Sequence, residues 1–269
     1  MFTREELDLV RFTKPFPWNI TMVKVFSFCL YGPPNKLYYP LRILENIYLI
    51  GTYFPDWKVY LYIAPDVDPG FLEQVTMYSN VVIRPTGKIG SINMVERFFA
   101  IDEPDVEIMM VRDADSHVHW KDRWAINEFL TNTQYDSHII RDNVEHTSKM
   151  MGGLWGMRKI DGLVIEDLYK LYKQSPTNRG YGEDQSFLTD YVYPYLWKKA
   201  LVHYSNNRRI EGETAVQFPF EYVNELYCGR CDFDNFVDSP QPPFSSEKVK
   251  FKDSKFSVTK IFSSLKLEN

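Results

Sequence analysis

The stretch Val106-Glu107-Ile108-Met109-Met110-Val111, followed at once by Arg112-Asp113-Ala114-Asp115-Ser116, decides how the rest of this sequence is interpreted. Its first half is an apolar run of strand length. In an extended segment residues i and i+2 point the same way, so Asp113 and Asp115 can converge on one cation. Mg²⁺ and Mn²⁺ prefer such oxygen ligands and commonly bridge them to substrate phosphates. The alternative is a charged turn in which Asp115 caps the next helix.

Strands and helices alternate on the N-terminal side of this stretch. Apolar runs and period-two patterns predict strands over residues 22–30, 57–63, 81–84 and 106–111. Helical spacing predicts helices over 37–53, 69–79 and 91–101, with Asp68 and Ser91 as N-caps. This order predicts an α/β fold with an open, twisted, mainly parallel sheet of Rossmann-like type, flanked by helices. Ligands of such sheets bind beyond the carboxyl ends of the strands, where Asp113 lies.

The pattern on the C-terminal side is more mixed. Helices are expected over residues 121–130, 161–174 and 183–199, the last disturbed by Pro194, and strands over 138–141, 152–158 and 201–204. Regular periodicity fades after Ser205. We therefore expect an N-terminal extension (1–21), one domain (22–205) and an irregular C-terminal segment (206–269) whose tail is loosely held.

Composition excludes several classes of protein. The 269 residues are 44% hydrophobic and 25% charged, which suits one substantial core, and the net charge of −5 argues against a nucleic-acid partner. No apolar run is long enough for a membrane span, and the charged N-terminus does not resemble a signal peptide, so a cytoplasmic location is expected. Cys29 is expected to be a buried thiol. Cys228 and Cys231 lack further zinc ligands nearby, so we expect incidental cysteines in a turn, with a zinc or redox role as the minor alternative.

Several ordered motifs resemble the GT-A glycosyltransferases, which use nucleotide-diphosphate sugars. The resemblance spans about residues 23–203 and rests on Arg97, Asp113-Ala114-Asp115, Gly152-Gly153-Leu154-Trp155-Gly156, Gly182-Glu183-Asp184-Gln185 and His203. The set looks like the small glycosyltransferases of large DNA viruses, including a capsid-glycan transferase type of algal viruses. The resemblance implies a GT-A fold over most of the chain.

The resemblance also implies a donor site. Its nucleotide-binding residues would be Leu30, Tyr31, Gly32, Arg97 and Asp113-Ala114-Asp115. The metal, Mn²⁺ or Mg²⁺, would be held by Asp113, Asp115 and His203. A divalent cation stabilises the negative charge on the diphosphate leaving group, and Arg97 or Lys88 could add positive charge. Surface or core roles are the alternatives for Arg97 and His203.

Substrate contacts are expected from Asp142, Gly152, Gly153 and Trp155. The glycines permit close backbone approach to a ligand, and Trp155 offers a flat face for a sugar ring. A tightly packed strand and a core tryptophan are the structural alternatives. Asp142 follows an expected strand and could hold sugar hydroxyls.

The reaction course depends on Glu183, Asp184 and Gln185, the expected catalytic residues. An inverting transferase needs a carboxylate base for the acceptor hydroxyl, whereas some retaining members resemble this chain in carrying Asp-Gln here. We lean slightly to retention. An N-cap cluster is the structural alternative.

The expected function is transfer of a sugar, hexosyl or pentosyl, from a UDP-sugar to a hydroxyl of a glycan or glycoprotein. The C-terminal segment is expected on or near the acceptor site. One enzymatic alternative is a phosphohydrolase of the haloacid-dehalogenase type, although its aspartates usually follow the first strand. A nucleotidyltransferase is another, although a Gly-rich, Lys-containing phosphate loop is lacking. A non-catalytic carbohydrate-binding module is the third.

Overall fold

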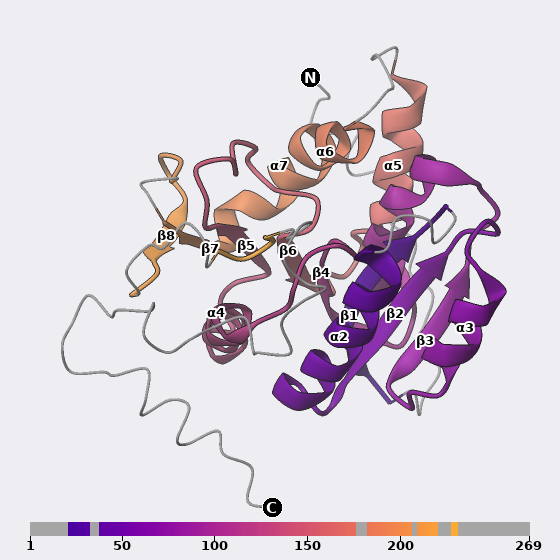
Figure 1. Cartoon of the computed structure of the whole chain (residues 1–269). Helices are drawn as coiled ribbons and strands as arrows, with labels where there is room; N and C mark the ends of the chain where they lie inside the picture. The colour runs from indigo at the N-terminus through magenta and orange to yellow at the C-terminus, as the bar shows by residue number, and fades with distance from the viewer. Residues whose placement is uncertain (1–20, 33–37, 176–181, 206–208, 220–226, 231–269) are drawn as a thin grey trace, which may run out of the picture.

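The computed structural model of the chain describes residues 21–32, 38–175, 182–205, 209–219 and 227–230 (Figure 1). Strands and helices alternate in its first half, as the sequence predicts. The strands are β1 (Val23–Leu30), β2 (Trp57–Ile63), β3 (Val81–Pro85), β4 (Val106–Val111), β5 (Ser137–Arg141), β6 (Trp155–Arg158), β7 (Ala200–Tyr204) and β8 (Thr214–Gln217). The helices are α2 (Tyr38–Tyr53), α3 (Pro69–Thr76), the 3₁₀ helix η1 (Gly90–Asp102), α4 (Trp120–Thr131), α5 (Ile165–Gln174), α6 (Glu183–Phe187), η2 (Leu188–Val192), α7 (Tyr193–Leu196) and η3 (Trp197–Lys199).

These strands form one eight-stranded sheet in the order β3-β2-β1-β4-β6-β5-β7-β8. All neighbouring pairs are parallel except the two that involve β6, which runs antiparallel to β4 and β5. The fold class is therefore the predicted one: α/β, with a mainly parallel sheet flanked by helices. No helix within the described ranges is both long and apolar enough to cross a bilayer.

Two hydrophobic clusters pack on opposite faces of this sheet. One joins the strands to η1, α5, α6, η2 and α7 and includes Phe98, Trp155 and Phe187. The other joins them to α2, α3 and α4 and includes Ile47 and Phe129. Figure 1 shows α5, α6 and α7 gathered on one side of the sheet, with α2 and α4 on the other. The candidate site lies on the η1 side.

Several element boundaries follow from local sequence. The Asp68 carboxylate accepts a hydrogen bond from the Phe71 amide at 3.2 Å, so the predicted N-cap of α3 is confirmed. Ser91 is not an N-cap, because η1 begins at Gly90 after the extended Ile89 and has 3₁₀ geometry. Asp115 does not cap α4 either; His119 does, in a capping box with Asp122.

The last predicted helix, over residues 183–199, is broken into four short pieces. Pro194 has no amide hydrogen to donate, and the chain passes from α6 through the π-helical turn η2 into α7 and η3 around it. Strand β8 lies where periodicity was expected to fade, and its residues are half exposed, which weakens the alternation of burial. The extension 1–20 and the tail from Ser239 lie outside the described residues.

Candidate functional site

An ion-pair cluster lies under the carboxyl ends of β1 and β4. Arg97 reaches it from η1 with only 3% of its surface exposed. Its Nη2 lies 2.8 Å from Asp113 Oδ1 and 3.4 Å from Asp184 Oδ2. Asp113 follows β4, and Asp184 is the second residue of α6, 87 positions after Arg97, so side chains distant in sequence meet at one guanidinium. The structure thus joins three residues that the sequence analysis nominated.

Two glycines press against this cluster. A Cβ atom on Gly153 would overlap the Asp113 carboxylate and lie 2.8 Å from the Asp113 backbone nitrogen. A Cβ atom on Gly152 would lie 3.1 Å from both Arg97 Nη2 and Asp184 Oδ2. Neither glycine lies in a strand, because β6 begins only at Trp155. Gly152 and Gly153 form the turn that leads into β6, and the absence of side chains lets the carboxylates come against the backbone.

Burial and charge act on the cluster in opposite directions. Desolvation by itself lowers the pKa of Arg97, but the carboxylates of Asp113 and Asp184 outweigh it, and the pKa is raised above its ordinary value. Burial raises the pKa of the Cys29 thiol to about 12, and its Sγ donates to the Asn93 carbonyl oxygen at 3.0 Å. Arg97 therefore stays cationic and Cys29 stays a neutral thiol at physiological pH.

The start of α6 presents its side chains in different directions. The Gln185 Oε1 accepts a hydrogen bond from the Gly152 amide at 3.1 Å, and its Nε2 donates to the Met150 carbonyl oxygen. The Glu183 carboxylate instead accepts from the Tyr169 hydroxyl at 2.9 Å and from Lys173 Nζ at 2.6 Å, both on α5. Asp184 and Gln185 thus belong to the cluster, whereas Glu183 is turned toward α5.

The expected nucleotide-binding segment lies next to the cluster. Leu30 ends β1 and is buried, while Tyr31 and Gly32 follow it half buried. Burial raises the pKa of Tyr31, and the charges of Arg97 and Asp115 also act on its hydroxyl. Gly32 has φ +81°, a conformation that favours glycine. Tyr31 is thus within electrostatic reach of the cluster.

Asp113 and Asp115 suit a divalent cation that is bound mainly through a diphosphate. Such an ion needs one or two protein carboxylates and takes its other oxygens from phosphate and water. The Asp113 side chain is 37% exposed, and the bare backbone of Gly153 lines its other side. Asp115 is also partly exposed, so neither carboxylate is enclosed by protein. Ala114 between them packs on the α2 side of the sheet.

Two residues expected to contact substrate, Trp155 and Asp142, lie instead in the core of this structure. Trp155 is fully buried and packs edge-on against Phe98, with ring centroids 5.6 Å apart. Asp142 is also fully buried; it accepts hydrogen bonds from Lys121 Nζ at 2.5 Å and Ser205 Oγ at 2.6 Å. A ligand in solvent reaches neither side chain.

His203 does not join the metal site that the sequence analysis expected. It lies on β7, and strands β6 and β5 separate β7 from β4, whose end carries Asp113. Its ring is fully buried, with Nδ1 2.8 Å from His138 Nε2 and Nε2 3.0 Å from Glu128 Oε2. Both nitrogens are engaged with other side chains, so the structure does not bring His203 to Asp113 and Asp115.

Lys88 likewise does not reach the cluster, because its ammonium pairs with Glu96 on the outer side of η1.

A buried polar network at the start of α4 was missed by sequence reasoning. His119, Asp122 and Cys228 offer ligand atoms within 4.8 Å of one another. Asp122 is already paired with Arg112 Nε at 2.8 Å, and His119 Nδ1 accepts from the Lys121 amide at 3.1 Å. The group therefore serves to satisfy buried charges and helix ends. Only the capping box of His119 and Asp122 could have been found from the sequence. Cys231, the second cysteine of the C-terminal pair, lies outside the described residues.

Comparisons with known proteins give matches among solved structures only. No protein-family model and no curated protein matches the chain. A glycosyltransferase involved in glycosylation of the major capsid of PBCV-1 matches at 14% identity and TM-score 0.45, over 69% of this chain and 85% of that one.

Two further matches are of the same quality. The 4-diphosphocytidyl-2C-methyl-D-erythritol synthase of Anaerococcus prevotii matches at 12% identity and TM-score 0.45, over 70% of this chain and 89% of that one. The Pyrobaculum calidifontis mannosyltransferase, solved with GDP-Man and Mn²⁺, matches at 14% identity and TM-score 0.43, over 80% and 62%. At these identities and scores, no match assigns a function to this chain.

Proposed function

We propose that this chain is a metal-dependent glycosyltransferase that moves a sugar from a nucleotide-diphosphate donor, with UDP as the nucleotide, to a hydroxyl of a glycan or glycoprotein. The observation that carries the proposal is the Arg97–Asp113–Asp184 cluster against the backbone of Gly152 and Gly153. It combines a buried cation, one partly exposed carboxylate and one nearly buried carboxylate at the edge where open α/β sheets bind ligands.

Each group has a task in this reaction. Asp113 and Asp115 would hold Mn²⁺ or Mg²⁺, which supplies positive charge to the diphosphate leaving group. Arg97 fixes the orientation of Asp113 through their 2.8 Å ion pair. It also carries a permanent charge beside the leaving group, where a preorganised cation stabilises developing negative charge. Tyr31 and Gly32 would contact the nucleotide.

The turn Gly152-Gly153 and the Gln185 amide would form the floor under the donor sugar. Gln185 holds this turn in place through its bonds to the Gly152 amide and the Met150 carbonyl oxygen. Because both glycines lack side chains, Asp113 packs against Gly153, and Arg97 and Asp184 pack against Gly152. Replacing either glycine would displace these charged groups.

We further propose that the sugar is transferred with retention. Asp184 is 9% exposed and its carboxylate is held by Arg97, while Glu183 is held by Tyr169 and Lys173. An inverting enzyme requires a carboxylate that takes the acceptor proton. Neither carboxylate is presented alone for that task, which favours the retaining course.

Calorimetry with UDP and Mn²⁺ tests the proposal directly. We expect UDP to bind with Mn²⁺ present and to bind at least ~10-fold more weakly in Asp115→Ala, since a lost metal ligand costs on the order of 1.4 kcal/mol or more. Asp190→Ala, an exposed aspartate on η2, is the matched control and should bind as the unchanged chain does. Absence of binding, or binding that Asp115→Ala leaves unaltered, refutes the proposal.

A donor-hydrolysis screen over nucleotide sugars then identifies the sugar. The anomeric configuration of the released sugar decides between retention and inversion. Hydrolysis of simple phosphate esters without any nucleotide-sugar turnover would favour the phosphohydrolase alternative. Sugar binding without nucleotide binding would favour a carbohydrate-binding module.

A further inference from the structure

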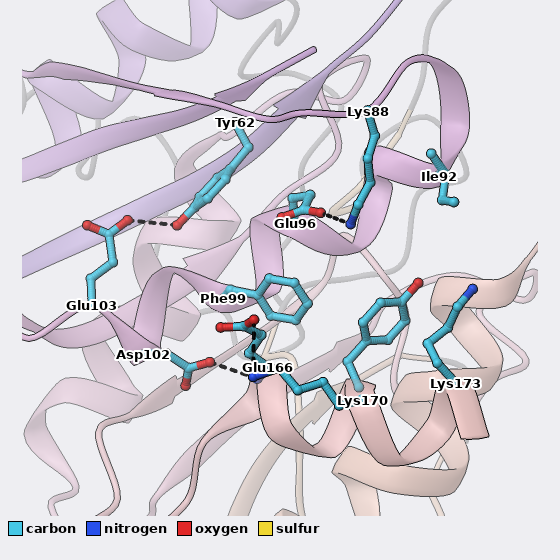
Figure 2. A pocket seen from close by; sticks show the side chains of 11 residues that line it. Tyr62, Lys88, Ile92, Glu96, Phe99, Asp102, Glu103, Glu166, Lys170 and Lys173 are labelled. Atoms are coloured by element: carbon cyan, nitrogen blue, oxygen red, sulfur yellow. Dashed lines mark hydrogen bonds and ion pairs between the residues drawn. The ribbon is translucent and has the colours of Figure 1, made fainter. Parts of the chain in front are cut away.

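An open groove of about 720 Å³ lies between η1 and α5, on the outer side of the elements that build the cluster (Figure 2). Its floor is aromatic and mostly buried, made by Tyr62 of β2, Phe99 of η1 and Tyr169 of α5. The rings of Phe99 and Tyr169 are tilted by 50° with centroids 5.7 Å apart. Ile92, whose surface is 48% exposed, lies at one end. This volume is within the range of small-ligand sites.

The groove and the cluster share one wall, η1, and are also linked through Glu183 of α6. On η1, Arg97 points inward to Asp113, while its neighbour Glu96 points outward and pairs with Lys88 (Figure 2). On α6, Asp184 points to Arg97, while its neighbour Glu183 bonds to Tyr169 and Lys173 at the groove. A ligand in the groove would therefore lie one residue away from the cluster along η1, and would contact two residues, Tyr169 and Lys173, that hold Glu183.

The charges around the groove are matched. Its three ammonium groups each have a carboxylate partner: Lys88 pairs with Glu96, Lys170 with Glu166 and Lys173 with Glu183. Two further lining carboxylates are also engaged. Asp102 accepts hydrogen bonds from the Ile165 and Glu166 amides at 2.9 and 2.8 Å, and Glu103 pairs with Arg84.

Such a lining suits a neutral ligand that is rich in hydroxyl groups. It has no excess of cations for a phosphate and no free carboxylate set for a cation. Hydroxyl groups both donate and accept, so they can bond to ammonium and carboxylate groups alike. Tyr62 and Tyr169 are each only 7% exposed, so the partly exposed ring of Phe99 is the one that offers apolar surface to the C–H side of a sugar ring.

We propose that this groove binds a neutral oligosaccharide, the distal sugars of the acceptor glycan. The assignment of that glycan as acceptor rests on the proposed function, whereas the binding of neutral sugar to the groove does not. The groove extends the acceptor contacts away from the reacting hydroxyl, along η1 and α5. Affinity in the groove then selects glycans by their neutral chain and not by a charged group.

A printed array of neutral and acidic glycans, probed with the full chain and no nucleotide, tests the inference. We expect retention of neutral glycans, and the best-bound one is then titrated against variants. Ile92→Glu and Lys170→Glu should each weaken its binding at least ~10-fold, because each changes the size and charge of an exposed groove residue. Met77→Glu, just after α3, is the matched control, since Met77 is 84% exposed and does not line the groove.

Three results would overturn the inference: no retained neutral glycan, stronger retention of acidic glycans, or equal affinity in all three variants. The same variants should keep UDP and Mn²⁺ binding, because they lie outside the cluster. Glycan binding with no UDP binding in the unchanged chain would sustain the groove and refute the proposed function. UDP binding with no glycan binding would refute the groove as a glycan site and leave the proposed function standing.

Discussion

At the scale of single residues, Arg97 is the group on which the candidate site depends. Its guanidinium is buried, yet it holds one partly exposed carboxylate and one nearly buried carboxylate. Removing the cation would leave Asp184 with uncompensated charge in a poorly solvated position, which proteins rarely tolerate. The exposed side of Asp113 is the part that remains available to a ligand.

Gly153→Ala is expected to impair the site without unfolding the chain. The added Cβ overlaps the Asp113 carboxylate and approaches its backbone nitrogen, so the aspartate or the turn must move. We expect donor hydrolysis to fall at least ~10-fold, since small misplacements of a positioned group cost that much or more. Hydrolysis rate and thermal unfolding are measured together.

Gly51→Ala is the matched control. Gly51 lies in α2, and a Cβ there would meet only Asn80 Nδ2, at an ordinary 3.7 Å. Because alanine is favoured over glycine in a helix, this variant should keep its activity and gain about 1 kcal/mol of stability. A Gly153→Ala variant that is as active as Gly51→Ala would contradict the role given to the turn.

His203→Asn is expected to lower stability and leave metal binding unchanged. The variant breaks the buried chain from His138 through His203 to Glu128 and leaves polar groups poorly matched, at a cost of about 1–3 kcal/mol. Chemical denaturation measures the loss, and calorimetry with UDP and Mn²⁺ measures binding. If UDP binding to the variant no longer depended on Mn²⁺, His203 would be shown to act as a metal ligand.

The residue patterns predicted the site in part. The spacing of Asp113 and Asp115 after an apolar run is local information, and it located the aspartates at the expected strand end. Trp155, Asp142 and His203 are residue types that serve equally well in cores and in sites. Which of these roles they take depends on partners such as Phe98, Lys121 and Glu128, which are distant in sequence.

At the scale of elements, α5 begins on a partly buried carboxylate, that of Asp102. Asp102 caps it from the end of η1, and burial raises the pKa of that carboxyl to about 6 from an ordinary 3.8. The folded chain therefore binds this proton more tightly than the unfolded chain does. The contribution of Asp102 to the free energy of unfolding falls as pH rises from about 4 to 6 and then stays level.

Asp102→Asn should remove this fall, because the amide does not titrate. Between about pH 4 and pH 7 the unchanged chain should lose up to about 3 kcal/mol of stability relative to Asp102→Asn, given the 1.36 kcal/mol per pKa unit. Urea denaturation of both proteins at the two pH values measures the difference. Parallel pH profiles would show that Asp102 titrates normally.

Elements with a regular period were predictable, and irregular ones were not. The Asp68 cap and the apolar run of β4 are signals within a few residues of one another. The 3₁₀ geometry of η1 and the break of the 183–199 helix depend instead on packing, since η1 must place Arg97 inward and Glu96 outward.

At the scale of the whole molecule, two hydrophobic clusters share one sheet. Strands β1, β2, β4 and β7 contribute side chains to both, so neither cluster can persist when the other is lost. We therefore expect a single cooperative unfolding transition. Far-UV circular dichroism and tryptophan fluorescence should give coincident curves in urea, and separate midpoints would indicate independent domains.

The sheet shows which features of the whole fold could be predicted from the sequence and which could not. Alternating strands and helices predicted a mainly parallel sheet, and this is confirmed. The residues 152–158 do not predict that β6 is antiparallel to β4 and β5. The direction of a strand is decided by where the chain turns, and the side-chain period is the same in either direction.

The reversal of β6 has a consequence for how the chain could diversify. Strand β5 ends, and β6 begins, at the same edge of the sheet. The two ends of the segment 142–154 that joins them therefore lie close together. Asp142 belongs to the core, and Gly152 and Gly153 press against the cluster, so only the middle of this segment can vary while the register from Ile108–Arg158 to Val111–Trp155 stays fixed. Chains that differ only between Asn143 and Lys149 are then expected to share one fold and one donor while using different acceptors. Grafting other loops into this range and measuring UDP affinity, which should stay unchanged, tests this expectation.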